Sequence, residues 1–192
     1  MGYSIDAGGG AGTSFSASSR TSVDKTNPAN LSGMIYQITV KTSLINLANS
    51  IKVASFIDEG SNVLSTREYA AITHAQLAAG THTFTAPDDF VPFGIASGDY
   101  IGAYISGIYF TSSGGSGMWY KDGDNIPCSS AEFTFSANYV QHIYAEGYEV
   151  GQINIGDSWK SIIGININIG DTWKPYIEGK INISDVWKDI NH

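Results

Sequence analysis

The 192-residue sequence has little of the chemistry that most enzymes and nucleic-acid-binding proteins use. It has one cysteine, Cys128, and only 15% of its residues are charged. A single cysteine excludes an intrachain disulfide, so we expect packing alone to hold the fold. The ten Lys and Arg residues are scattered and the formal net charge is -8. This balance argues against binding to the phosphate backbone of nucleic acid or to an anionic membrane surface.

Long apolar runs are also missing. No stretch approaches the roughly 20 apolar residues of a membrane span. Residues 1–6 lack the basic start and the apolar core of a secretion signal. We therefore expect no membrane insertion and no export by the ordinary route.

Motifs for catalysis are scarce. The four histidines show no two-ligand metal spacing, and no Gly-x-Ser-x-Gly elbow is present. The carboxylate pairs at 58–59 and 88–89 could hydrolyse glycosides only if they converged in a cleft, and both lie beside turn residues. The sequence predicts no enzyme, no catalytic residue, no cofactor and no resident metal. Asp122 and Asp124, on either side of Gly123, are weak candidates for a cation site.

The residues that are present favour β structure. Hydrophobic residues make up 42% of the chain and aromatic residues 12%, enough for a core. Short period-two alternations are separated by Gly, Asn, Asp or Pro, and no βαβ rhythm occurs. The pattern predicts an all-β fold, a jelly-roll-like antiparallel β-sandwich followed by a C-terminal β-hairpin repeat. The predicted strands are 35–40, 51–57, 64–72, 81–85, 99–105, 117–120, 132–135 and 140–144.

Three regions follow from this pattern. Residues 1–34 are rich in Gly and Ser and predict a flexible leader with a loose first strand. Residues 35–149 predict the β-sandwich domain, in which 73–80 resemble a capped helix of a turn or two. Residues 150–192 form the repeat.

The repeat is the strongest signal in the sequence. Ile-Asn-Ile-x-Asp-x-Trp-Lys occurs at 153–160, at 167–174 and at 181–188, each copy 14 residues after the last. The Ile-Asn-Ile alternation is β-like, and Gly-Asp at 156–157 and 170–171 suits a two-residue hairpin turn. Ser184 replaces the glycine in the third copy, so we expect a different turn there.

Isolated hairpins are marginal in water, so three regularly spaced tryptophans predict a partner surface. The ribbon packs either on its own sandwich or against ribbons of other subunits. Identical units favour the second, a homo-oligomer for which a trimer is one candidate. The residues expected to pack are Ile155, Trp159, Ile169, Trp173, Ile183 and Trp187.

Aromatic residues of the sandwich suggest a carbohydrate site. Tyr109, Trp119 and Tyr120 combine apolar rings with polar tips, which suits sugar. The alternative is that they are core and cross-strand pairs. Because neighbouring residues in a strand point to opposite faces, we expect either Trp119 or Tyr120 to be exposed.

Several segments resemble a known group of proteins. The segments at 27–33, 53–56, 65–69, 98–102, 113–119 and 123–128 resemble a β-sandwich module of phage and prophage structural proteins, over roughly residues 12–147. The repeat is similar to the short Trp-Lys hairpin repeats at the ends of many phage tail and virion proteins. The resemblance implies particle assembly, decoration or attachment to a host surface.

The sequence therefore favours a self-associating virion protein, of the tail-fibre, head-fibre or capsid-decoration type. Its expected partners are itself, other virion proteins and a host-surface carbohydrate, and it would be made in the host cytoplasm without a signal peptide. A cellular surface filament or adhesin subunit is the first alternative, and a glycan-active enzyme is the second.

Overall fold

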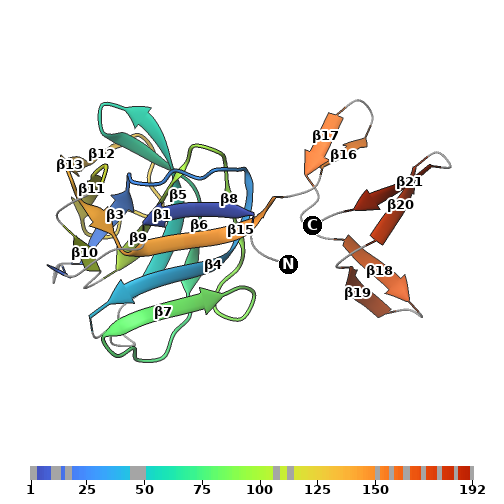
Figure 1. Cartoon of the computed structure of the whole chain (residues 1–192), viewed down its shortest axis with the longest axis horizontal. Helices are drawn as coiled ribbons and strands as arrows, with labels where there is room; N and C mark the ends of the chain where they lie inside the picture. The colour runs from blue at the N-terminus through green and yellow to red at the C-terminus, as the bar shows by residue number, and fades with distance from the viewer. Residues whose placement is uncertain are drawn as a thin grey trace.

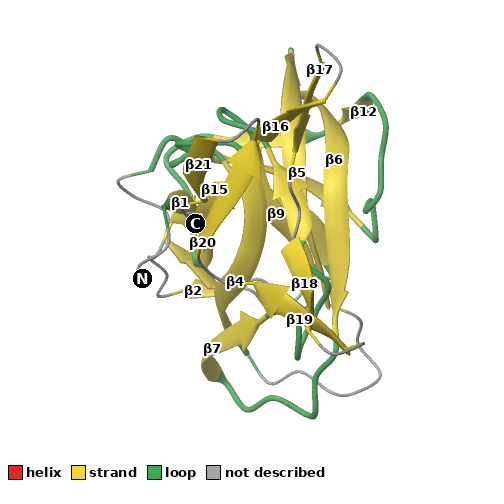
Figure 2. Cartoon of the chain, turned by 90° about the vertical axis from the view of Figure 1, so that its right-hand side faces the viewer, coloured by secondary structure: helices red, strands yellow, loops and turns green. Residues whose placement is uncertain are grey.

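The chain is an antiparallel β protein built in two layers. The computed structural model describes residues 4–9, 14–15, 19–43, 51–105, 109–111 and 115–149, and the backbone of six further strands between 152 and 190. Every strand pair in these ranges is antiparallel (Figures 1 and 2). This confirms the all-β antiparallel class. No helix in this part of the chain is long and apolar enough to cross a membrane.

The larger layer is a seven-stranded sheet that nearly closes into a barrel. Its strands, in sheet order, are β12 (Ala131–Glu132), β6 (Val63–Ile72), β5 (Ile51–Gly60), β9 (Tyr100–Ile105), β3 (Arg20–Asp24), β11 (Met118–Asp122) and β13 (Thr134–Ser136). The two edge strands are consecutive in the chain, with only Phe133 between them. β12 pairs with β6, whereas β13 pairs with β11, so one short segment joins both edges of the sheet.

The second layer is a five-stranded sheet. Its order is β1 (Ile5–Gly9), β15 (Ile143–Glu149), β4 (Gly33–Thr42) and β7 (Gly80–Thr85), and β8 (Phe93–Ile95) also pairs with β4. Strands β7 and β8 therefore share one edge of β4, because they pair with its two halves. In Figure 2 this sheet and the seven-stranded sheet lie face to face.

Two hydrophobic cores meet at strands β5 and β9, which are buried on both faces. Ile51 and Val53 of β5 and Ile101 of β9 pack in a cluster with residues of the five-stranded sheet. Ala54 and Phe56 point the other way, into a second cluster inside the barrel-like sheet. Burial on both faces explains why apolar residues occupy adjacent positions in the first part of β5, as at Val53 and Ala54, which is expected of a central strand.

The second core is organised around Trp119. Its side chain is 1% exposed, and its ring meets Tyr100 edge to face at 5.1 Å between centroids. The indole Nε1 donates to Asn62 Oδ1 at 3.0 Å. The Lys25 ammonium lies 4.4 Å from the ring centroid and covers it from outside. The indole is thus packed, hydrogen-bonded and capped at once.

The first 34 residues supply strands β1, β2 (Ser14–Phe15) and β3, whereas the sequence predicts a flexible leader with one loose first strand there. Strand β1 pairs with β15, β3 pairs with β9 and β11, and β2 joins β10 (Tyr109–Thr111) and β14 (Val140–Gln141) in a three-stranded sheet. Gly8 has φ +90°, and a Cβ there would collide with the backbone of Ile143 and with Ile101. The absence of a side chain at Gly8 therefore allows β1 to lie close to the strands that carry Ile143 and Ile101.

The segment at 73–80 does not form the short helix that its capping pattern suggests. The backbone of residues 73–79 is irregular apart from one isolated bridge residue, and Gly80 begins β7. The Thr73 N–H donates to the Asp89 carbonyl at 2.9 Å. The Thr73 N–H thus bonds to a loop later in the chain, and not to a group within the predicted helical turn.

Each C-terminal repeat contains one antiparallel strand pair. The pairs are β16 (Gln152–Ile155) with β17 (Ser158–Ser161), β18 (Ile165–Ile169) with β19 (Thr172–Tyr176), and β20 (Gly179–Ile183) with β21 (Val186–Ile190). The register is the same in all three, since the central Asn always lies opposite the Trp. Each pair is its own two-stranded sheet. The residues between the paired strands lie outside the described ranges.

Trp119→Ala should lower the free energy of unfolding by about 3–5 kcal/mol, because it empties the centre of the second core. Phe135→Ala is the matched control. That ring lies 6.2 Å from Trp119 but is 38% exposed, so its removal should cost roughly 1 kcal/mol. Urea unfolding of both variants tests this, and equal losses would contradict the assignment of Trp119 as the centre.

Candidate functional site

The aromatic residues proposed from the sequence as a sugar site do not form an exposed platform. Trp119 belongs to the core, so its indole offers no open face for a sugar ring. Tyr120 is half-buried, and the Arg20 guanidinium stands 4.9 Å from its ring centroid. The side chain of Tyr109 lies outside the described residues. Of the adjacent pair, the tryptophan points inward and the tyrosine outward, as strand alternation requires.

The acidic loop after β11 is organised by cations of the protein itself. The Asp124 carboxylate pairs with Lys52 Nζ at 2.5 Å, and Asp122 lies 3.8 Å from Arg20. The Ile126 N–H donates to Asp124 Oδ1 at 3.1 Å. Asp124 is therefore a turn acid paired with Lys52. Asp122 ends β11 as an exposed side chain beside Arg20.

The carboxylate pair considered for catalysis at 58–59 lies at the end of β5, beside the turn into β6. Asp58 accepts the Gly60 N–H at 2.9 Å. The Glu59 carboxylate accepts hydrogen bonds from the hydroxyl groups of Ser65 and Ser130, and these bonds lower its pKa. Both acids therefore hold the β5–β6 hairpin and the loop beside it.

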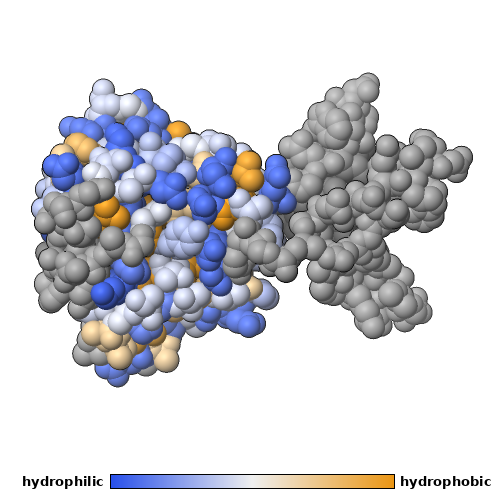
Figure 3. All heavy atoms as spheres, viewed as in Figure 1, coloured by the Kyte–Doolittle hydropathy of each residue, from blue (hydrophilic) through white to orange (hydrophobic). Residues whose placement is uncertain are grey.

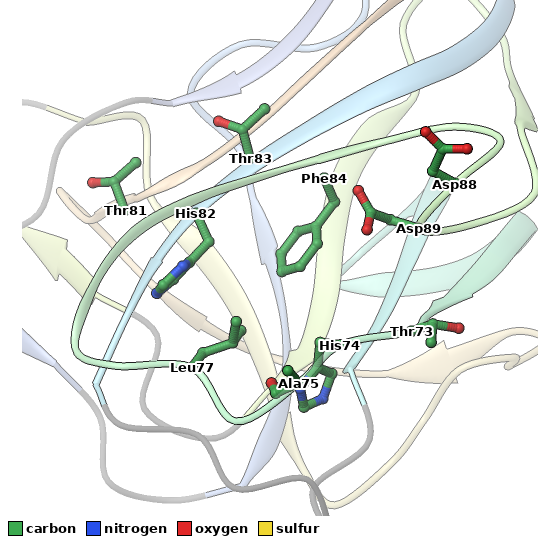
Figure 4. Close-up of a pocket in the computed structure, with 10 residues that line it drawn as sticks. All are labelled: Thr73, His74, Ala75, Leu77, Thr81, His82, Thr83, Phe84, Asp88 and Asp89. Carbon is green, nitrogen blue, oxygen red and sulfur yellow. Dashed lines mark hydrogen bonds between the residues drawn. The ribbon is translucent and has the colours of Figure 1, made fainter.

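A polar hollow of about 440 Å³ lies beside edge strand β7. Its lining includes His74, His82, Asp88 and Asp89 (Figure 4). One nitrogen of each imidazole contacts a backbone carbonyl at 2.8 Å. Asp89 Oδ2 accepts the Thr85 N–H at 2.7 Å. In the figure the Phe84 ring stands between His82 and the two aspartates.

These contacts anchor loops to the end of β7. They do not assemble the nucleophile and base that catalysis requires. Among the residues that the structure describes, no group of three or more His, Cys, Asp or Glu side chains is placed to hold a metal ion.

The outer face of the five-stranded sheet carries a different set of tyrosines. Along β15, Ile143 and Ala145 are buried whereas Tyr144, Glu146 and Tyr148 are half-buried and lie on the opposite face of the strand. Tyr36 of β4 joins them, with its ring 5.5 Å from that of Tyr148 and tilted by 58°. This face is turned to the viewer in Figure 3, where it is mostly hydrophilic.

A strip of polar groups crosses the same face between the tyrosines. Glu146 lies opposite Asp6 of β1 on one side and Gln37 of β4 on the other. Gln37 Nε2 donates to Glu146 Oε2 at 2.5 Å. Burial, aided by the charges of Glu146 and Asp6, raises the pKa of the Tyr144 phenol.

The sequence contained a signal for this surface. Tyr144, Glu146 and Tyr148 alternate with small or apolar residues over the whole of β15. The strand predicted at 140–144 stops too early to reveal that alternation, so this tyrosine face is absent from the sequence-based candidates.

The residues predicted to pack in the repeat are placed only by their backbone. Ile155, Ile169 and Ile183 end the first strand of each pair, and Trp159, Trp173 and Trp187 lie one position into the second. Their side chains lie outside the described residues.

One buried acid ties the layers together. Asp24 of β3 is fully buried. Its carboxylate accepts the Thr26 N–H at 2.7 Å and the Gln141 N–H at 3.1 Å. Burial raises the pKa of Asp24, and these hydrogen bonds, with one from Gly9, oppose the rise. The acid thus joins the seven-stranded sheet to the three-stranded one.

Asp24 should make stability depend on pH in a definite direction. Because its folded pKa lies above the ordinary 3.8, the folded chain binds this proton more tightly than the unfolded chain does. Its contribution to the unfolding free energy is therefore largest below pH 3.8 and declines as pH rises through the folded pKa.

Asp24→Asn removes that titration. The stability difference between wild type and variant, measured by urea unfolding between about pH 4 and pH 7, should fall as pH rises. A difference that grows with pH would show that the folded pKa is lowered instead.

The chain was compared with protein-family models, with curated proteins and with solved structures. None of them matches it. The basis for a function is therefore the geometry described above together with the repeat.

Proposed function

We propose that this protein is a non-enzymatic structural component of a virus particle, of the tail-fibre, head-fibre or capsid-decoration type, that associates with copies of itself. In this proposal a jelly-roll-like sandwich carries a C-terminal hairpin repeat that holds subunits together. Its setting is the assembled virion, and its other partners are further virion proteins and a host-surface carbohydrate.

The observation that carries the proposal is the threefold strand pair in one register. A two-stranded sheet is marginal in water by itself, and each repeat forms one such sheet. Each also has two edges, whose backbone groups can pair with another chain. Units that share the Ile-Asn-Ile, Asp and Trp-Lys positions and one register are suited to packing against the same units of other subunits.

The resemblance of the sandwich and of the repeat to phage structural proteins supports the same setting. The formal net charge of -8 also supports this setting, because a net charge away from zero favours solubility of a particle component. The turn roles of Asp58, Glu59 and Asp89 favour a structural protein over the glycan-active enzyme.

Light scattering of the full chain tests self-association. The expected mass is a multiple of the 20.5 kDa subunit. Replacing Trp159, Trp173 and Trp187 together by Ser should return the mass to that of one subunit, because the ribbons lose the apolar area that joins them. A wild-type mass of one subunit would refute the proposal, and so would a variant that keeps the oligomeric mass.

Val91→Ser is the matched control. Val91 is 77% exposed on the sandwich, so its replacement removes apolar surface without touching the repeat. The mass of this variant should equal that of wild type. A fall in its mass would place the contact on the sandwich.

A further inference from the structure

The outer face of the five-stranded sheet has the composition of a carbohydrate platform. Tyr144 and Tyr148 stand on the same side of β15. They are four residues apart, which is about 13 Å along a strand. Tyr36 extends the second position by its contact with Tyr148. The face therefore offers two aromatic positions at a separation that suits an oligosaccharide.

The groups between these positions are hydrogen-bonding ones. Asp6, Glu146 and Gln37 form one row across β1, β15 and β4. Thr39 and Thr83 lie level with Tyr144 in the neighbouring row, with their hydroxyls 3.0 Å apart. Carboxylates accept and amides and hydroxyls both donate and accept, which matches the hydroxyl groups of a sugar.

Tyrosine supplies what these polar groups lack. A sugar ring has an apolar face of C–H groups and a polar rim, and a tyrosine has an apolar ring and a polar tip. The sheet holds the rings at fixed spacing, because β15 is paired on both sides. Little conformational entropy should then be lost on binding.

The negative charge of the face further restricts the class of glycan that it can bind. The row contains two carboxylates, Asp6 and Glu146, and the whole chain has a formal charge of -8. An acidic sugar would be repelled both locally and by the field of the protein. A glycan without carboxylate or sulfate groups would not.

We infer that this face, with Tyr36, Tyr144, Tyr148, Gln37 and Glu146, binds a neutral oligosaccharide. The inference deepens the proposed function and rests on it for the biological setting, a particle that contacts a host surface. The inferred sugar site is centred on these residues and not on Trp119, which is buried in the core.

A glycan array probed with the full chain tests the inference. Hits should be neutral oligosaccharides of more than one sugar. Hits confined to acidic glycans, or no hits at all, would overturn the inference. If light scattering shows an oligomer in either case, the proposed assembly role still stands.

Variants locate the site. Tyr144→Thr and Tyr148→Thr keep a residue that favours strands, and each should weaken binding of the best hit about tenfold in calorimetry. Tyr69→Thr is the control, since Tyr69 is 45% exposed on β6 of the other sheet. The affinity of this variant for the same glycan should match that of wild type. Equal losses in all three variants would refute the assignment.

The same variants distinguish a sugar from a protein occupant. Their thermal midpoints and oligomeric mass should match those of wild type. A mass that falls in Tyr144→Thr or Tyr148→Thr would identify this face as a contact between copies of the chain or with the repeat, and would overturn the carbohydrate assignment.

Discussion

The structure depends on two strands that are buried on both faces. Strands β5 and β9 give Ile51, Val53 and Ile101 to the core between the sheets, and Ala54 and Phe56 to the core inside the curved sheet. Each fully buried side chain of this size contributes roughly 1.5–3 kcal/mol. Because both cores share these strands, the five-stranded layer and the barrel-like sheet are one cooperative unit, and the polar outer faces are left for other work.

The loops are fixed to this unit by polar contacts. Arg67 of β6 binds Asp99 with two hydrogen bonds, of 2.5 and 3.1 Å, and Asp99 also accepts the Ala96 N–H. Ser55 in the middle of β5 donates to the Gly94 carbonyl at 2.7 Å. Strand β8 and the loop that follows it are thereby held to β5 and β6 of the seven-stranded sheet. Charged and hydroxyl side chains of the two sheets stabilise the architecture in this way.

Much of the fold was predictable from period-two patterns, because the segments predicted as strands at 35–40, 51–57, 64–72, 81–85 and 99–105 overlap β4, β5, β6, β7 and β9. The role of Gly8 was not, since its need for glycine comes from β15, far away in sequence. Alternation required Trp119 and Tyr120 to face opposite ways, but only the curvature of the sheet decides which of them is inside. The tyrosine face was missed because its alternation begins where the predicted strand ended, and its partner Tyr36 lies on a different strand.

The central claim is that the repeat associates with copies of itself. The most direct measurement is the mass, by light scattering, of an unrelated monomeric carrier fused to residues 150–192. We expect the fusion to be an oligomer, because strand pairs that share one register can pack against the same pairs of other copies. A fusion that remains monomeric at concentrations where the full chain associates would contradict it, and the contact would then have to include the sandwich.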